Sequence, residues 1–143
     1  MSAPYRVQLS RKKGWRKPEN TVVVARPSKW GNPFTIGSFK QVRGGRREFS
    51  VNLMLGAQPY IQFEHNARTI AVEEFRRLMA LPRPIDPRDL PWWLIERQTV
   101  MIDNLNTLRG KNLACWCPLT DADGNRVACH ADVLLEIANE VTS

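Results

Sequence analysis

The sequence lacks a hydrophobic run long enough to span a membrane, and it holds only three cysteines and two histidines among 143 residues. A membrane-spanning helix needs roughly 20 consecutive apolar residues, so we expect none here. The first residues also lack the apolar core of a signal peptide. An odd number of cysteines argues against a disulfide framework, which is typical of oxidising compartments. We therefore expect a cytoplasmic protein whose thiols stay reduced.

Acidic residues are scarce in the first part of the chain. Residues 1–50 hold twelve Lys and Arg against only Glu19 and Glu48, whereas residues 51–143 hold nine basic and twelve acidic residues. The net charge of +7 therefore originates in the first third of the chain, which includes the basic N-terminal segment 1–20. This asymmetry favours an anionic partner, namely a nucleic acid, a nucleotide or phosphate. We expect no membrane partner, since the chain lacks a long apolar run. A surface that only keeps the protein soluble is the alternative.

The order of apolar segments predicts the fold class. The chain is long enough for one domain, residues 1–143, with its own hydrophobic core. Apolar, β-branched runs predict strands, and apolar positions at helical spacing predict helices. The expected strands cover 6–9, 21–26 and 111–117, and the expected helices cover 66–80, 98–110 and 130–140. This order predicts an α/β domain with a three-layer, mainly parallel, Rossmann-like sheet and helices packed on it.

Two unusual loops directly follow predicted strands. The segment 25–34, ARPSKWGNPF, leaves the strand 21–26, and a loop rich in cysteine leaves the strand 111–117. In parallel sheets, ligands bind at the carboxyl ends of the strands. We therefore expect a functional site where these two loops meet.

Two further local patterns lie outside these loops. The pair Gly44 and Gly45 predicts a turn or a mobile loop. Trp92 and Trp93 follow a proline-rich connector, and we expect them to pack between a helix and the sheet. An exposed protein-binding patch is the alternative for this tryptophan pair.

All three cysteines and one histidine gather in the strand–loop–helix region 112–140. Side chains two residues apart on a strand point to the same side, and the loop that follows is long enough to bring both pairs together. Three thiolates and one imidazole form the closed tetrahedral set of a structural zinc site. We predict that zinc fixes the start of the last helix through Cys115, Cys117, Cys129 and His130.

Two other interpretations of this cluster stay open. Cys129 at the start of a helix beside a histidine is also typical of a reactive thiol, because free N–H groups there favour the thiolate. Asp132 would then orient His130. In the remaining interpretation, the cysteines are small hydrophobic residues of the core.

The loop 25–34 has features of a nucleotide site. Gly31 lets the backbone approach a ligand, and Asn32 precedes a proline, which holds it extended so that its amide can contact a base or sugar. Trp30 offers a ring on which a base can stack. The alternative is a rigid loop in which Trp30 and Phe34 belong to the core.

Basic residues of this loop and of the segment 43–48 are candidates for binding phosphate. Arg26 and Lys29 lie within the loop, and Arg46 and Arg47 follow the glycine pair. Guanidinium groups donate paired hydrogen bonds to phosphate oxygens. We expect the segment 43–48 to close over the site, with a solvated flexible turn as the alternative.

Three stretches resemble the family named domain of unknown function 4326, which occurs in phages and bacteria. They are RVQLSRKKGWRKPENTVVVARPSKWGNPF, LRGKNLACWC and CHADVLLEIAN. The resemblance covers nearly the whole chain and implies a compact α/β domain without implying an activity. The insert LTDADGNRV departs from the shorter connection that many members have. The positions that match the family's pattern are Arg26, Trp30, Gly31, Asn32, Pro33, Arg47, Glu48, Arg109, Gly110, Cys115, Cys117, Cys129 and His130.

These observations predict a small α/β protein with a zinc site and a nucleotide- or nucleic-acid-directed phosphate site. They leave open whether it is an enzyme. Transfer or hydrolysis of a nucleotide would use Glu48 or Asp132 as general acid or base, or Cys129 as a nucleophile. The competing function is a zinc-stabilised module that binds DNA or RNA without chemistry.

Overall fold

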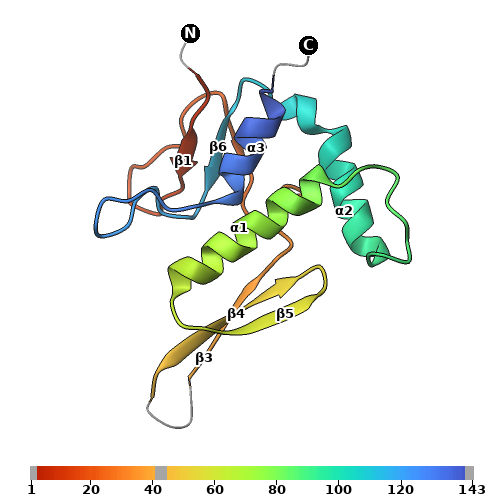
Figure 1. Cartoon of the computed structure of the whole chain (residues 1–143). Helices are drawn as coiled ribbons and strands as arrows, with labels where there is room; N and C mark the ends of the chain where they lie inside the picture. Colours follow the sequence, from red (N-terminus) through yellow and green to blue (C-terminus); the bar gives the residue numbers. More distant parts are fainter. Residues whose placement is uncertain (1–2, 41–44, 141–143) are drawn as a thin grey trace.

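The fold contains two small sheets and three α-helices, as a computed structural model shows for residues 3–40 and 45–140 (Figure 1). The α/β class predicted from the sequence is therefore confirmed. In chain order the elements are β1 (Arg6–Gln8), β2 (Thr21–Val23), β3 (Ile36–Lys40), β4 (Arg47–Leu53), β5 (Gly56–Ile61), α1 (Glu64–Ala80), α2 (Trp92–Asp103), the 3-10 helix η1 (Leu105–Leu108), β6 (Asn112–Cys115) and α3 (His130–Ala138).

The first sheet is parallel, with strand order β1–β6–β2. Its central strand β6 is buried along its whole length, which suits its short apolar sequence, NLAC. The register pairs Gln8 of β1 and Val23 of β2 with the last two residues of β6. All three strands thus end at the same edge, and the loops that follow them leave the sheet together.

The second sheet is antiparallel, with strand order β3–β4–β5. The prediction of one mainly parallel, Rossmann-like sheet is therefore wrong, because half of the described strands belong to this second sheet. Its edge strands read IGSFK and GAQPYI, and their glycines and proline conceal the β-branched pattern that marks a strand. Gly44 of the predicted turn lies outside the described residues, between β3 and β4.

Helix α1 crosses the middle of the molecule, between the parallel sheet with α3 and the antiparallel sheet (Figure 1). Its buried face includes Ala67, Ala71, Phe75 and Leu78 at helical spacing. The two alanines let neighbouring chain segments approach closely. One result is a hydrogen bond of 3.1 Å from the Asn32 amide to the Ala71 carbonyl oxygen, which anchors the loop after β2 to this helix.

Helix α2 begins earlier than the sequence indicated and carries its tryptophans outward. Its buried residues are Leu94, Gln98 and Met101, and the helix ends where the Asn104 amide donates to the Val100 carbonyl oxygen. Trp92 and Trp93 lie off this buried face and are 72% and 47% exposed. The expectation that they pack between helix and sheet is therefore wrong.

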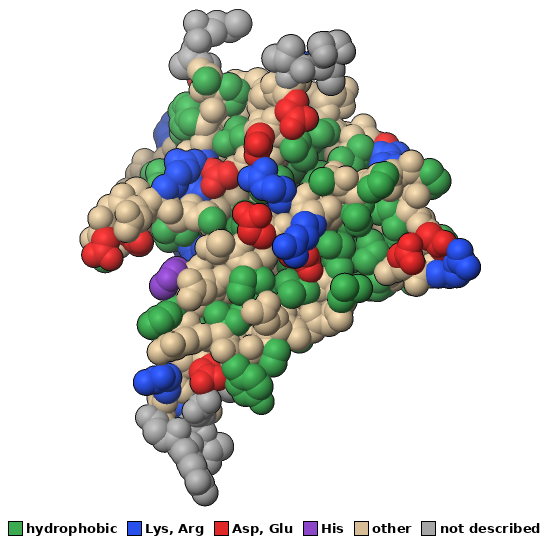
Figure 2. Space-filling model, in the orientation of Figure 1, with side chains coloured by type: hydrophobic (Ala, Val, Ile, Leu, Met, Phe, Trp, Pro, Cys, Tyr) green, Lys and Arg blue, Asp and Glu red, His purple; other side chains and the backbone are tan. Residues whose placement is uncertain are grey.

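The surface that bears α1 and α3 mixes both signs of charge (Figure 2). Arg76 of α1 pairs there with Glu136 of α3 at 2.5 Å. None of the helices in the described part of the chain has both the length and the apolar character needed to cross a membrane.

Gly31 provides a test of the close packing in the loop after β2. A Cβ atom at this position would lie 2.5 Å from Arg26 Cγ and 3.2 Å from its Cα. We predict that Gly31→Ala lowers the free energy of unfolding by about 1–3 kcal/mol, because the backbone must shift to relieve the overlap. Urea denaturation measures this change, and an unaltered midpoint would contradict the packing described.

Candidate metal centre and adjoining pocket

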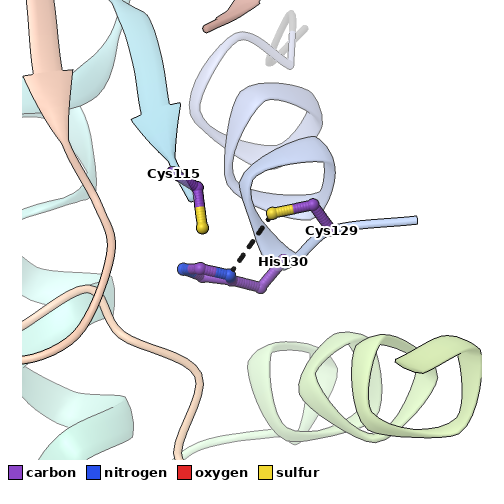
Figure 3. A group of neighbouring side chains, drawn as sticks. All are labelled: Cys115, Cys129 and His130. Atoms are coloured by element: carbon purple, nitrogen blue, oxygen red, sulfur yellow. Dashed lines mark hydrogen bonds between the residues drawn. The ribbon is translucent and has the colours of Figure 1, made fainter. Parts of the chain in front are cut away.

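His130 is fixed by a hydrogen bond to the backbone of the loop after β2. Its Nε2 atom lies 2.8 Å from the Val24 carbonyl oxygen and must donate, because a carbonyl only accepts. The ring is 6% exposed and meets Phe75 edge-on, with 5.5 Å between centroids. The other nitrogen, Nδ1, therefore faces the cysteines, 3.6 Å from Cys129 Sγ (Figure 3). Val24, and not Asp132, orients this imidazole.

Two cysteines approach the same imidazole from different elements. Cys115 is the last residue of β6, and Cys129 is the N-cap residue of α3 (Figure 3). They are 6% and 1% exposed. The two sulfur atoms and a ring nitrogen of His130 all lie within 4.8 Å of one another. Such a spacing allows a single metal ion to contact all three.

Cys117 adjoins this group through Cys115. Its Sγ lies 3.8 Å from Cys115 Sγ, because side chains two residues apart at a strand end point to the same side. With bonds of about 2.3 Å to sulfur and 2.0–2.1 Å to nitrogen, a tetrahedral zinc site has edges of about 3.8 Å between two sulfurs and about 3.5–3.6 Å between sulfur and nitrogen. The distances from Cys117 to Cys115 and from Cys129 to His130 match these edges.

The three thiols share protons unequally. Hydrogen bonds from Cys117 and Cys129 lower the pKa of Cys115 below the usual thiol range. The pKa values of Cys117 and Cys129 are raised, first by their hydrogen bonds to Cys115 and further by burial. A second thiolate beside the first is unfavourable in a buried site unless a cation is present. The three thiols can therefore all become thiolates only if a cation binds among them, as in a metal-binding site.

A buried ion pair holds the cysteine loop against the first turn of α3. The Arg6 side chain is 1% exposed and donates to Asp132 Oδ2 at 2.7 Å. Arg6 also donates to the carbonyl oxygens of Val127 and Pro118, at 2.7 and 3.0 Å. Asp132 Oδ2 in turn accepts from the Cys129 backbone N–H at 3.3 Å, which completes the cap of the helix. The Asp132 carboxylate is thus part of the scaffold of the cluster.

A pocket of about 400 Å³ adjoins the cysteine cluster. The four candidate ligands line it together with residues of the loop after β2, of β3 and of α1. Arg26 and Arg68 line the same pocket from two different elements, and Glu64 adds one carboxylate. Arg68 is only loosely paired, since its Nη2 lies 3.6 Å from Glu64 Oε1. The pocket therefore combines thiols, an imidazole and two guanidinium groups.

The structure brings only part of the loop 25–34 into this pocket. Arg26 and Asn32 line it, but the Asn32 amide is engaged by the Ala71 and Phe34 backbones. Trp30 is 3% exposed and packs in the core, as the alternative interpretation has it. Lys29 lies near Trp92 and Trp93, in a separate hollow.

The residues after the glycine pair lie on or beside the antiparallel sheet. Arg46 is exposed, and Arg47 of β4 donates to Ser38 Oγ at 3.0 Å. Ser38 lines the pocket, so Arg47 reaches its border. Glu48 lies on β4 opposite Phe39, outside the described lining of the pocket.

Comparison with protein families identifies residues 7–140 as a domain of unknown function, DUF4326. The chain belongs to the DUF4326 family. This confirms the resemblance seen in the sequence. The match includes the strand ends and the start of α3, so the cysteine cluster and the pocket both lie within the DUF4326 domain. Searches of curated proteins and of solved structures found no match.

Sequence reasoning missed two arginines of this site. Arg6 was only part of a predicted edge strand, and the signal available in the sequence was a charged residue between Tyr5 and Val7. Arg68 lies in a helical segment where arginine is common, so its direction toward the pocket could not be read from the sequence.

Arg6 gives a test of the scaffold. We predict that Arg6→Gln lowers the free energy of unfolding by about 3–5 kcal/mol, because it leaves a partly buried carboxylate and several carbonyl oxygens without their partner. The exposed pair of Arg83 with Asp103 offers a control, and Arg83→Gln should cost less than about 1 kcal/mol. Equal effects of the two variants in urea denaturation would contradict the role of Arg6.

Proposed function

We propose that this protein binds zinc through Cys115, Cys117, Cys129 and His130, and that the adjoining pocket binds a phosphate-bearing nucleotide. The observation that carries the proposal is the grouping of these four side chains in the lining of a pocket that Arg26 and Arg68 also line. The metal site and the nucleotide site would then both lie at the carboxyl ends of the parallel strands.

The donor set favours zinc over other common metal ions. Sulfur-rich tetrahedral sites suit zinc, whereas calcium and magnesium prefer oxygen ligands. The Nε2 hydrogen bond of His130 to Val24 leaves Nδ1 as the metal-binding atom and fixes the ring, as is usual for histidine ligands. Bound zinc would cross-link the end of β6 to the start of α3 and offset most of the negative charge of the thiolates. Its role is then structural.

The charges of the pocket favour an anionic ligand of nucleotide type. Arg26 and Arg68 can donate to phosphate oxygens from two sides, and the volume of about 400 Å³ lies within the range of small-molecule sites. The apolar side chains of Phe34, Ile36 and Val72 line the pocket as well and offer contacts for a base.

Transfer or hydrolysis of the nucleotide is a second candidate function. Glu64 is the carboxylate that lines the described pocket, and it lies at the start of α1 beside Arg68. A general base needs this kind of access to the reacting atoms. If the protein turns over a nucleotide, Glu64→Gln should remove turnover while leaving nucleotide binding and zinc content intact.

Metal content tests the first half of the proposal. We predict one zinc ion per chain in protein purified without chelator, and loss of this zinc in both Cys115→Ser and Cys117→Ser, because each variant removes a thiolate ligand. Elemental analysis of the folded proteins measures it, with circular dichroism as the control for folding. A wild-type protein that carries no metal would contradict the proposal.

Nucleotide binding tests the second half. We predict that a ribonucleoside 5′-monophosphate binds the zinc-loaded protein, and that Arg68→Gln weakens binding by about tenfold or more, since a charged hydrogen bond to phosphate is lost. Arg77→Gln is a matched control on α1, because Arg77 is 74% exposed and lies outside the described lining of the pocket. Isothermal titration calorimetry measures both, and equal affinities would exclude phosphate binding by Arg68.

A further inference from the structure

The basic segment 9–17, which follows β1, leaves the parallel sheet at the edge that carries the cysteine cluster. The chain continues alongside β6 after β1, since Leu9 N donates to the Cys115 carbonyl oxygen at 2.9 Å. The next residues include Arg11, Lys12 and Lys13, all exposed. Three loops therefore meet at this edge, and not only the two that the sequence indicated.

The cations of this segment have no acidic partners within the described residues. The ion pairs of the structure involve Arg6 and arginines from Arg68 onward. Elsewhere on the surface, as on the face shown in Figure 2, basic and acidic side chains lie together. An unpaired and exposed group of cations is the electrostatic arrangement of a surface that binds phosphates. The exposed cations of the segment are Arg11, Lys12, Lys13, Arg16 and Lys17.

Trp116 links this basic segment to the pocket. It lies between Cys115 and Cys117, lines the pocket and is 46% exposed. The Arg11 guanidinium carbon lies 4.8 Å from the centre of its ring, so a cation and an aromatic surface are already adjacent. Aromatic rings beside a row of cations are the usual means of binding unpaired bases with their backbone.

We propose that the ligand of this site is a single-stranded nucleic acid, whose backbone lies along the basic segment while one base stacks on Trp116 at the mouth of the pocket. This inference rests on the proposed nucleotide function of the pocket and names its substrate class. Only an unpaired base can stack on the ring of Trp116, because the bases of a duplex stack on one another. The pocket volume of about 400 Å³ suits one nucleotide and not a duplex. The strand would thus present a single nucleotide beside the metal centre.

Fluorescence anisotropy with a labelled oligothymidylate of about 12 nucleotides tests the inference on the zinc-loaded protein. We expect the single strand to bind more tightly than a duplex hairpin, and its affinity to fall steeply with salt because phosphate contacts release counterions. Unlabelled polyglutamate at matched charge should not displace it. If polyglutamate displaces the labelled strand as effectively as the unlabelled oligonucleotide does, the proposal is overturned in favour of an acidic protein partner.

A charge variant with a matched control tests the basic segment. The combined change Arg11→Gln, Lys12→Gln and Lys13→Gln should weaken oligonucleotide binding by about tenfold or more and reduce the slope of log affinity against log salt by about 2. The control removes the same charge at Arg83, Arg88 and Arg109, which lie in other parts of the chain, and should change affinity by less than about twofold. Equal losses in the two variants would overturn the proposal.

Trp116 is tested by two substitutions. Trp116→Ala should weaken single-strand binding by about 5- to 100-fold through loss of stacking, while Trp116→Phe should retain most of the affinity. Zinc content must equal that of the wild type in both variants, because Trp116 lies between two candidate ligands. Oligonucleotide affinity unchanged in Trp116→Ala with its zinc intact would overturn the proposal.

Mononucleotide titration separates this inference from the proposed function. The basic-segment variant should bind a mononucleotide as the wild type does, because Arg26 and Arg68 are intact. Suppose that the wild type binds the mononucleotide, and that the basic-segment variant binds the oligonucleotide as tightly as the wild type does. The inference then fails, and the proposed function of the pocket stands. If the oligonucleotide depends on the basic segment and Trp116 while no mononucleotide binds, the pocket function fails instead.

Discussion

The hydrogen bond from His130 Nε2 to the Val24 carbonyl oxygen is the contact on which the site depends. It ties the first turn of α3 to the chain leaving β2, and it directs Nδ1 toward the thiols of Cys115 and Cys129. Without this hydrogen bond, the imidazole could rotate. The loop after β2 and the loop after β6 would then no longer be connected at His130. Arg6 acts in the same region by holding the cysteine loop against α3. The His130 contact is buried and the Arg6 contacts are partly buried, so both constrain the geometry of the cluster.

The parallel sheet explains why so many groups meet in one place. Its three short strands end in register, so loops distant in sequence emerge side by side. The loop after β1 carries cations that have no acidic partner among the described residues, the loop after β2 carries Arg26, and the cysteines lie at the end of β6 and along the loop that leads to α3. Helix α1 closes the site from the other side and contributes Arg68. A bound zinc ion would cross-link the end of β6 to the start of α3 and make this edge rigid.

The sequence predicted the strands of the parallel sheet and the gathering of Cys115, Cys117, Cys129 and His130, because these depend on local apolar runs and on alternation along one strand. It did not predict any strand of the antiparallel sheet, and glycines and a proline hide the period of its two edge strands, β3 and β5. Trp30 looked like a stacking surface, yet the compact loop around Gly31 draws it into the core. The sequence does not indicate a role for Trp116, and only the fold brings Arg11 over its ring. Local patterns in a single sequence do not specify contacts between segments that lie far apart in the chain, so these contacts were not predicted.

The most direct test of the account is X-ray absorption at the zinc edge on the purified wild-type protein. We predict a shell of three sulfurs at about 2.3 Å and one nitrogen at about 2.0–2.1 Å around the zinc ion. A shell of oxygen or nitrogen atoms without sulfur, or the absence of a zinc signal, would contradict it.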